Sequence, residues 1–118
     1  MILVDTSVWV DHLRHARGPL GELLGQKRVL THPFVLGELA CGHLHPRAEI
    51  LRRISTLPGA TVARHAEVLR LIEEHRLAGS GLGWVDLHLL ASALVSSAQI
   101  LTLDRALRRV AARIGVAA

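Results

Sequence analysis

Short apolar runs alternate with amphipathic segments along this chain, and no tight hairpin turn joins one run to the next. A short apolar run is typical of a buried strand, and an amphipathic segment is typical of a helix. Strands that are separated by helices pair in parallel, because a parallel pair needs a long crossover connection. The alternation therefore predicts an α/β fold, namely a three-layer α/β/α sandwich with a mainly parallel central sheet.

Turn and capping signals divide the chain into predicted elements. The expected strands are residues 2–5, 28–31, 60–63, 99–102 and 116–117. The expected helices are residues 8–15, 20–24, 33–41, 47–56, 66–77, 84–97 and 105–114. Thr6 or Ser7 is a suitable N-cap for the first helix, because a hydroxyl oxygen can accept a bond from a free helical N–H.

Length and composition limit the class of protein. The 118 residues are sufficient for one domain, so we expect a single domain over 1–118. Half of the residues are apolar, which excludes intrinsic disorder. No apolar run is long enough to span a membrane, and no basic leader precedes the first apolar run. Cys41 is the only cysteine, so it is interpreted as a small buried residue, and the chain as a cytoplasmic protein.

The charge is basic and comes mainly from arginine. Fourteen Lys and Arg residues against ten Asp and Glu give a net charge of +4, and Lys27 is the only lysine. Guanidinium groups bind phosphate oxygens in pairs, which suits contact with nucleic acid. Four arginines, at 105, 108, 109 and 113, lie mostly on one side of the last predicted helix. That side is either an RNA- or partner-binding surface or a solubilising one.

Two predicted strands end in an aspartate, Asp5 after the first and Asp104 after the fourth. Ligands of open parallel sheets bind beyond the carboxyl ends of the strands, so both side chains are expected at the same edge. Each aspartate is also a good N-cap for the helix that follows it. Capping alone would explain either residue taken singly.

Two further acids occupy apolar segments. Glu38 lies within the segment 34–41 and Asp86 within 84–91, and neither has a lysine or arginine within four residues. A buried charge is costly unless it is paired or bound to a metal. The other six acids have polar neighbours and are interpreted as solvated.

If Asp5, Glu38, Asp86 and Asp104 converge, they repel one another at close range. A divalent cation relieves that repulsion, and oxygen ligands favour Mg²⁺ or Mn²⁺. Such a cation polarises a phosphoryl oxygen and activates water for in-line attack. This chemistry does not need the ribose 2′-hydroxyl, so by itself it leaves DNA open as a substrate.

Four motifs in this order resemble the PIN domain, and most closely the VapC-type toxin ribonucleases. The motifs are Val4-Asp5-Thr6-Ser7, Glu38-Leu39-Ala40-Cys41-Gly42, Asp86-Leu87-His88-Leu89-Leu90-Ala91 and Leu101-Thr102-Leu103-Asp104. The resemblance covers residues 2–107. Leu107 departs from it, since members often have Phe there, and so do His32 and Val35, where hydroxyl residues are common.

The resemblance implies a parallel sheet between helices and a metal-dependent endoribonuclease. It also implies a homodimer and a cognate antitoxin. By position it implies an acidic site of Asp5, Glu38, Asp86 and Asp104, with Mg²⁺ or Mn²⁺ as cofactor and RNA as substrate. Thr6, Ser7 or Thr102 would then supply a supporting hydroxyl.

Other functions fit the residues less well. A haloacid-type phosphatase needs an aspartate two residues after Asp5, where Ser7 stands. A receiver domain needs a lysine after its last strand, and Lys27 is far too early. A catalytically silent RNA- or protein-binding module with the same acidic pocket remains the main alternative. Trp9 and Trp84 are interpreted as core residues.

Overall fold

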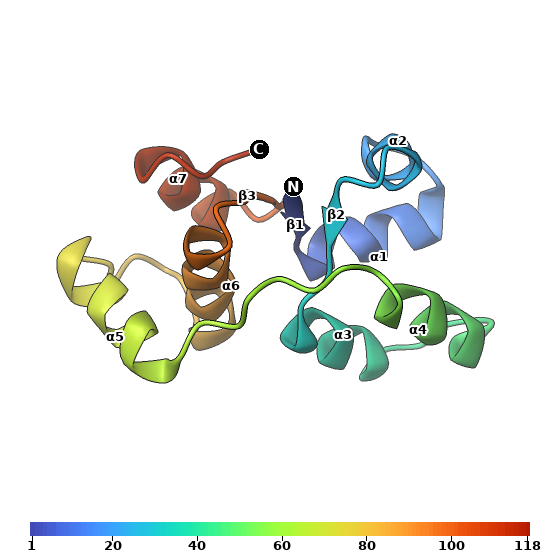
Figure 1. The fold of residues 1–118 in the computed structure, drawn as a ribbon, viewed down its shortest axis with the longest axis horizontal. Coiled ribbons are helices and arrows are strands. Elements are labelled where there is room, and N and C mark those ends of the chain that lie inside the picture. Colours follow the sequence, from blue (N-terminus) through green and yellow to red (C-terminus); the bar gives the residue numbers. More distant parts are fainter.

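The computed structural model describes residues 1–118, with a small parallel sheet surrounded by helices (Figure 1). The strands are β1 (Ile2–Val4), β2 (Val29–Leu30) and β3 (Gln99–Leu101), in the order β2-β1-β3. Both pairings of β1 are parallel, so the three strands end at the same edge. The predicted α/β fold with a parallel sheet is confirmed.

Seven helices make up most of the chain. They are α1 (Thr6–His15), α2 (Leu20–Gly25), α3 (Pro33–Ala40), α4 (Arg47–Ser55), α5 (His65–Glu74), α6 (Trp84–Val95) and α7 (Arg105–Arg113). All seven were predicted, with ends that differ by a few residues. None of them is both long enough and apolar enough to cross a membrane.

Two of the predicted strands are not strands. Residues 60–63 belong to the extended segment that crosses the molecule from α4 to α5 (Figure 1), and its only bridge to the sheet joins Gly59 to Thr31. Near the C-terminus, Ala117 makes a single bridge to Ile100. A single bridge fixes one residue against the sheet without forming a ladder, so neither segment adds a strand to the order β2-β1-β3.

The core lies around β1, whose three residues are all buried. The buried apolar side chains form one contiguous cluster that also includes residues of every helix. Helix α6 packs against β1 and β3 and is buried from Leu87 to Ala93. Asp5, which follows β1, therefore lies at the end of a fully buried strand.

Two predictions about the burial of apolar residues are wrong. Cys41 is exposed, because it follows the last residue of α3 where the chain turns outward. Trp84 is 41% exposed, since it is the first residue of α6, where the helix leaves the core.

Two buried histidines join α3 to α6. The Nδ1 atom of His32 accepts a bond from Phe34 N–H, which caps α3, and its Nε2 atom lies 3.0 Å from Ser92 Oγ. Burial, with a smaller contribution from His88, lowers the pKa of His32 to about 4. Neither ring nitrogen of His88 has a hydrogen-bond partner, and burial and His65 lower the pKa of His88. Both side chains are therefore neutral at pH 7.

We expect the free energy of unfolding to fall as the pH is lowered from about 6.5 to about 4, because only the unfolded chain then binds a proton at His32. His32 alone accounts for about 2 kcal/mol between about pH 7.5 and about pH 5. Urea unfolding at the two pH values measures the loss. His32→Asn keeps a capping side chain and should lose less than the wild type, whereas the exposed His15→Asn should match the wild type. An equal loss in His32→Asn would exclude His32 as the cause.

Candidate active site

Asp5 directly follows β1 and is the most extensively bonded of the four acids. Its side chain is 6% exposed. Its Oδ1 atom accepts a bond from Thr6 N–H at 2.8 Å. Its Oδ2 atom accepts bonds from Ser7 Oγ at 2.8 Å and Thr102 Oγ1 at 2.7 Å. These bonds hold the carboxylate in one orientation and offset the cost of burying it.

The same two hydroxyls bind the backbone that follows β3. Ser7 Oγ accepts a bond from Leu103 N–H, and Thr102 Oγ1 accepts one from Asp104 N–H, both at 3.0 Å. Asp5 and Asp104 are thereby held at the same edge of the sheet, as predicted. Each also caps a helix, so capping and membership of the cluster occur together rather than as alternatives. The N-cap of α1 is Asp5, and not Thr6 or Ser7 as predicted.

Glu38 reaches this edge from α3. Its Oε1 atom accepts a bond of 2.7 Å from Thr6 Oγ1, which joins α3 to the start of α1. The expectation that Glu38 is buried was wrong, because Val35 and Leu39 point into the core and Glu38 lies on the exposed side of α3. Its place in the cluster rests on the bond to Thr6 and not on burial.

Asp86 completes the group from the first turn of α6. Partial burial raises the pKa of Asp86, and the charges of Asp5, Asp104 and Glu38 raise it further, against a bond from Gly83 N–H that lowers it. Because Coulomb interactions fall with distance, these three contributions place Asp86 within electrostatic range of the other three carboxylates. The structure therefore brings together the four acids that the sequence singled out.

The atoms of the cluster that could bind a metal are all carboxylate oxygens. None of the four acids makes an ion pair. Three carboxylate oxygens have no hydrogen bond from the protein, namely Glu38 Oε2, Asp86 Oδ1 and Asp104 Oδ2. Uncompensated carboxylates with free oxygens fit a hard divalent cation such as Mg²⁺ or Mn²⁺. No three of the His, Cys, Asp and Glu side chains lie close enough together to hold an ion as they stand.

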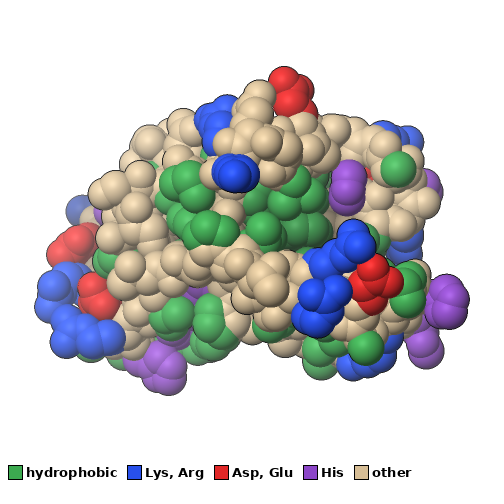
Figure 2. Space-filling view, turned by 45° about the vertical axis from the view of Figure 1, so that its right-hand side comes forward, with side chains coloured by type: hydrophobic (Ala, Val, Ile, Leu, Met, Phe, Trp, Pro, Cys, Tyr) green, Lys and Arg blue, Asp and Glu red, His purple; other side chains and the backbone are tan.

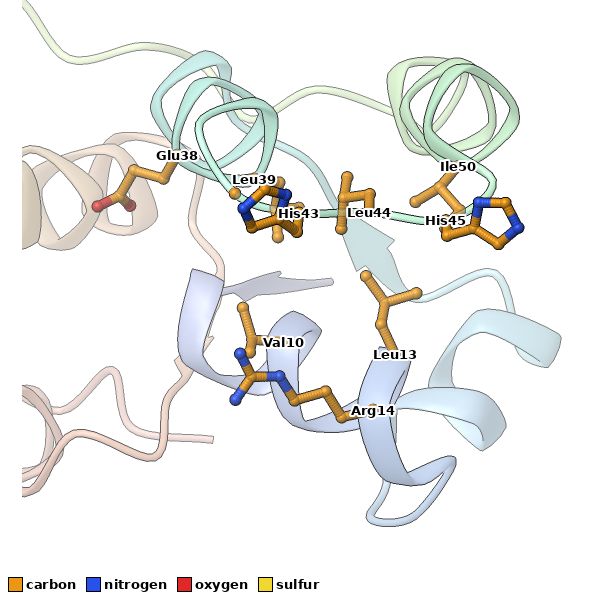
Figure 3. Close-up of a pocket in the computed structure, with 10 residues that line it drawn as sticks. Val10, Leu13, Arg14, Glu38, Leu39, His43, Leu44, His45 and Ile50 are labelled. Atoms are coloured by element: carbon orange, nitrogen blue, oxygen red, sulfur yellow. The ribbon is translucent and has the colours of Figure 1, made fainter.

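Sequence reasoning missed a cleft that begins at the cluster. Figure 3 shows it between α1 and the segment that joins α3 to α4, with Glu38 at one end and Arg14 and His43 on its walls. Helical periodicity could have found Arg14, because Thr6, Val10 and Arg14 recur every four residues and share one side of α1. No local signal identifies His43, which lies beyond the end of α3.

A parallel α/β domain with four acids at the carboxyl edge of its sheet is the architecture of a known family. A model of the PIN domain matches residues 2–113, and the chain belongs to this family. It is 48% identical over 118 residues to Ribonuclease VapC32 of Mycobacterium tuberculosis, in strain CDC 1551 / Oshkosh and in strain ATCC 25618 / H37Rv. The match covers 99% of this chain and 95% of each relative. At this identity and coverage, the chain is a nuclease of the VapC type.

Thr102→Val should lower the free energy of unfolding by about 1–3 kcal/mol, because it leaves Asp104 N–H without its partner and removes one of the two bonds to Asp5 Oδ2. Urea denaturation measures this difference. Thr56→Val is the matched control, since the Thr56 hydroxyl is exposed and bonds only to a carbonyl three residues back. Equal losses in the two variants would mean that the Asp5–Thr102 bond contributes little.

In EDTA, Asp86→Asn should raise Tm, because an amide removes a charge that the other three carboxylates repel, yet still accepts the Gly83 bond. The sign follows from the raised pKa: the ionised Asp86 lowers stability increasingly as the pH rises. Mg²⁺ or Mn²⁺ at about 100 times its Kd should stabilise the wild type by about 2.7 kcal/mol. Differential scanning calorimetry tests both effects. Asp11 lies outside the cluster, so the Tm of Asp11→Asn in EDTA should not exceed that of the wild type.

Proposed function

We propose that this chain is a divalent-metal-dependent endoribonuclease that hydrolyses RNA phosphodiester bonds, and that residues 1–118 form one nuclease domain. The observation that carries the proposal is the convergence of Asp5, Glu38, Asp86 and Asp104 from four different elements, without a cation to pair with them. The similarity to proteins named ribonucleases supports RNA as the substrate.

The residues that we assign to the metal are Asp5, Glu38, Asp86 and Asp104, and the cation is Mg²⁺ or Mn²⁺. When bound, such a cation supplies positive charge that polarises a phosphoryl oxygen and favours deprotonation of water. Asp5 is the acid whose orientation is most firmly held, because its two oxygens accept three hydrogen bonds. Thr6 orients Glu38, and Ser7 and Thr102 orient Asp5; none of the three hydroxyls needs to touch the substrate.

In the reaction, a water oxygen forms a new bond to phosphorus as the bond to the leaving ribose oxygen breaks. One of the four carboxylates would take a proton from the attacking water, and the leaving oxygen gains a proton. One fragment then ends in a phosphate and the other in a hydroxyl. No histidine is needed as a base, and the two buried ones, His32 and His88, are neutral at pH 7.

The assignment as a VapC-type nuclease also leads us to propose the binding partners and the cellular location of the chain. As a VapC-type toxin, the chain would act on RNA in the cytoplasm, form a homodimer and be held inactive by a cognate antitoxin protein. The VapC name of the relatives supports the antitoxin. The exposed apolar side chains Leu69, Leu94 and Val95 of α5 and α6 are available for contact between two copies.

Purified protein, freed of any bound partner, should cut single-stranded RNA in Mn²⁺ or Mg²⁺ and not in EDTA. Asp5→Asn and Asp104→Asn should each lower the cleavage rate by roughly 100-fold or more, because a metal contributes several kcal/mol to the transition state. Gel analysis of labelled RNA measures the rates.

Asp11→Asn is the matched control, since Asp11 pairs with Arg17 on the exposed side of α1, and it should cut like the wild type. A DNA strand of the same sequence tests whether the ribose matters. RNA that is bound but never cut would support the catalytically silent module instead. Cutting that survives both active-site variants would refute the assignment of the acids.

A further inference from the structure

The cleft that starts at Glu38 lies next to the acidic cluster and has no role in the proposed reaction. It has a volume of about 160 Å³ and lies between α1 and the end of α3. Half of its ten lining residues are hydrophobic, and they include Val10 on α1 and Leu39 and Leu44 on the opposite wall (Figure 3). The cleft therefore continues from the acidic cluster, but its lining is mainly apolar and basic, and Glu38 is its only acidic residue.

Arg14 is the cation on the α1 wall of this cleft. It makes no ion pair or hydrogen bond within the chain, whereas the nearby Arg17 is paired with Asp11 and Arg47 bonds to the carbonyls of Gly42 and Ala40. Side chains on a helix lean toward its N-terminus, so Arg14 is directed toward the end of α1 that carries Thr6. Figure 3 shows its guanidinium group extending past Val10 toward the Glu38 end of the cleft.

The distance along α1 fits a position next to the reacting phosphate. Thr6 bonds to Glu38, and Arg14 lies eight residues further on, which is about 12 Å along the helix axis. The long arginine side chain covers part of that distance. His43 adds a second polar group on the opposite wall of the cleft (Figure 3).

Other cations are less suitable. On the face shown in Figure 2, the lysine and arginine side chains are scattered around an apolar centre and form no continuous basic stripe. In α7, Arg108 bonds to the Thr102 carbonyl and Arg113 to the His75 carbonyl, so two of its four arginines stabilise the fold. Arg14 is thus the free cation that shares a cleft with one of the acids.

We infer that this cleft holds the nucleotide next to the scissile bond, with Arg14 as a positioning residue that binds its phosphate. The base or ribose of that nucleotide packs against the apolar side chains that line the cleft, and His43 contacts the RNA from the wall opposite Arg14. Phosphate is the chemical group that an unpaired guanidinium beside a metal-binding cluster is suited to bind. The inference rests on the proposed function, because it takes the substrate to be RNA.

The chain offers a matched pair of variants that block the cleft or leave it open. A Cβ atom at Gly42, in the cleft lining, would meet only the Leu39 carbonyl oxygen, at 3.6 Å, so Gly42→Leu places its side chain in the cleft without backbone strain. A Cβ atom at Gly25, at the end of α2, would meet nothing within 4 Å. Gly25→Leu is therefore the control for adding the same side chain elsewhere.

Binding is measured on the Asp5→Asn background, so that cleavage does not interfere, by fluorescence anisotropy of a short labelled single-stranded RNA. Arg14→Gln should weaken binding about tenfold and reduce the slope of log K against log salt by about 0.7, the loss of one phosphate contact. Gly42→Leu should weaken binding with an unchanged slope. Arg70→Gln, the same change on α5, and Gly25→Leu should bind as the parent does.

Kinetics on the otherwise wild-type chain give the second readout. Arg14→Gln should raise KM for RNA more than it lowers kcat, and Arg14→Lys should restore part of the loss, which a purely structural role would not produce. Unchanged binding in Arg14→Gln, or equal weakening in Arg14→Gln and Arg70→Gln, overturns the inference. A polyglutamate peptide is tested in the same binding assay. If Arg14→Gln loses binding to this peptide but keeps its binding to RNA, the inference is also overturned, and the cleft is assigned to an acidic protein segment.

The two proposals fail separately. A wild-type chain that does not cut RNA in Mn²⁺ or Mg²⁺ overturns the proposed function, and the anisotropy results still decide whether the cleft binds RNA. A wild-type chain that cuts, with an Arg14→Gln variant of unchanged KM and salt slope, overturns only the role of Arg14.

Discussion

The hydrogen bond between Thr102 and Asp5 joins the two strands on which the site is built. Parallel pairing of β1 with β3 brings Val4 opposite Leu101, so Asp5 and Thr102 leave the sheet at the same level. At that level the chain must bury a carboxylate, and it does so by giving Asp5 three donors. The turn into α7 depends on the same hydroxyl, because Asp104 N–H bonds to Thr102 Oγ1.

The acidic cluster opposes the stability of the fold that carries it. Repulsion among carboxylates is strongest where water is excluded, and the structure limits it by burying only Asp5 fully. Glu38 and Asp104 lie in exposed positions, and Asp86 is half-buried with a raised pKa. The cluster lies next to the apolar core around β1 and α6, and burial of that core offsets the free-energy cost of the repulsion. That unrelieved negative charge attracts a divalent cation, and without the cation it would repel the phosphates of RNA.

The physical origin of each signal explains which parts of the site were predictable. Asp5 and Asp104 were found because an apolar run that ends in aspartate marks a strand end, and parallel strands end together. Glu38 was found for a reason that proved wrong, since its apolar neighbours are buried and it is not. Cys41 and Trp84 were misplaced because an apolar residue at a helix end has no neighbour on its outer side.

By itself, the sequence determined the class of fold, the seven helices and the four acids, because these depend on periodicity and on residues close together in the chain. Only the tertiary structure decided which oxygens are free, that Ser7 and Thr102 hold Asp5, and that Arg14 and His43 face one cleft. These facts depend on contacts between residues that lie far apart in the chain, such as Asp5 and Thr102, and no local pattern encodes them. Such contacts also determine how much of each carboxylate's charge is exposed to water, and hence the raised pKa of Asp86.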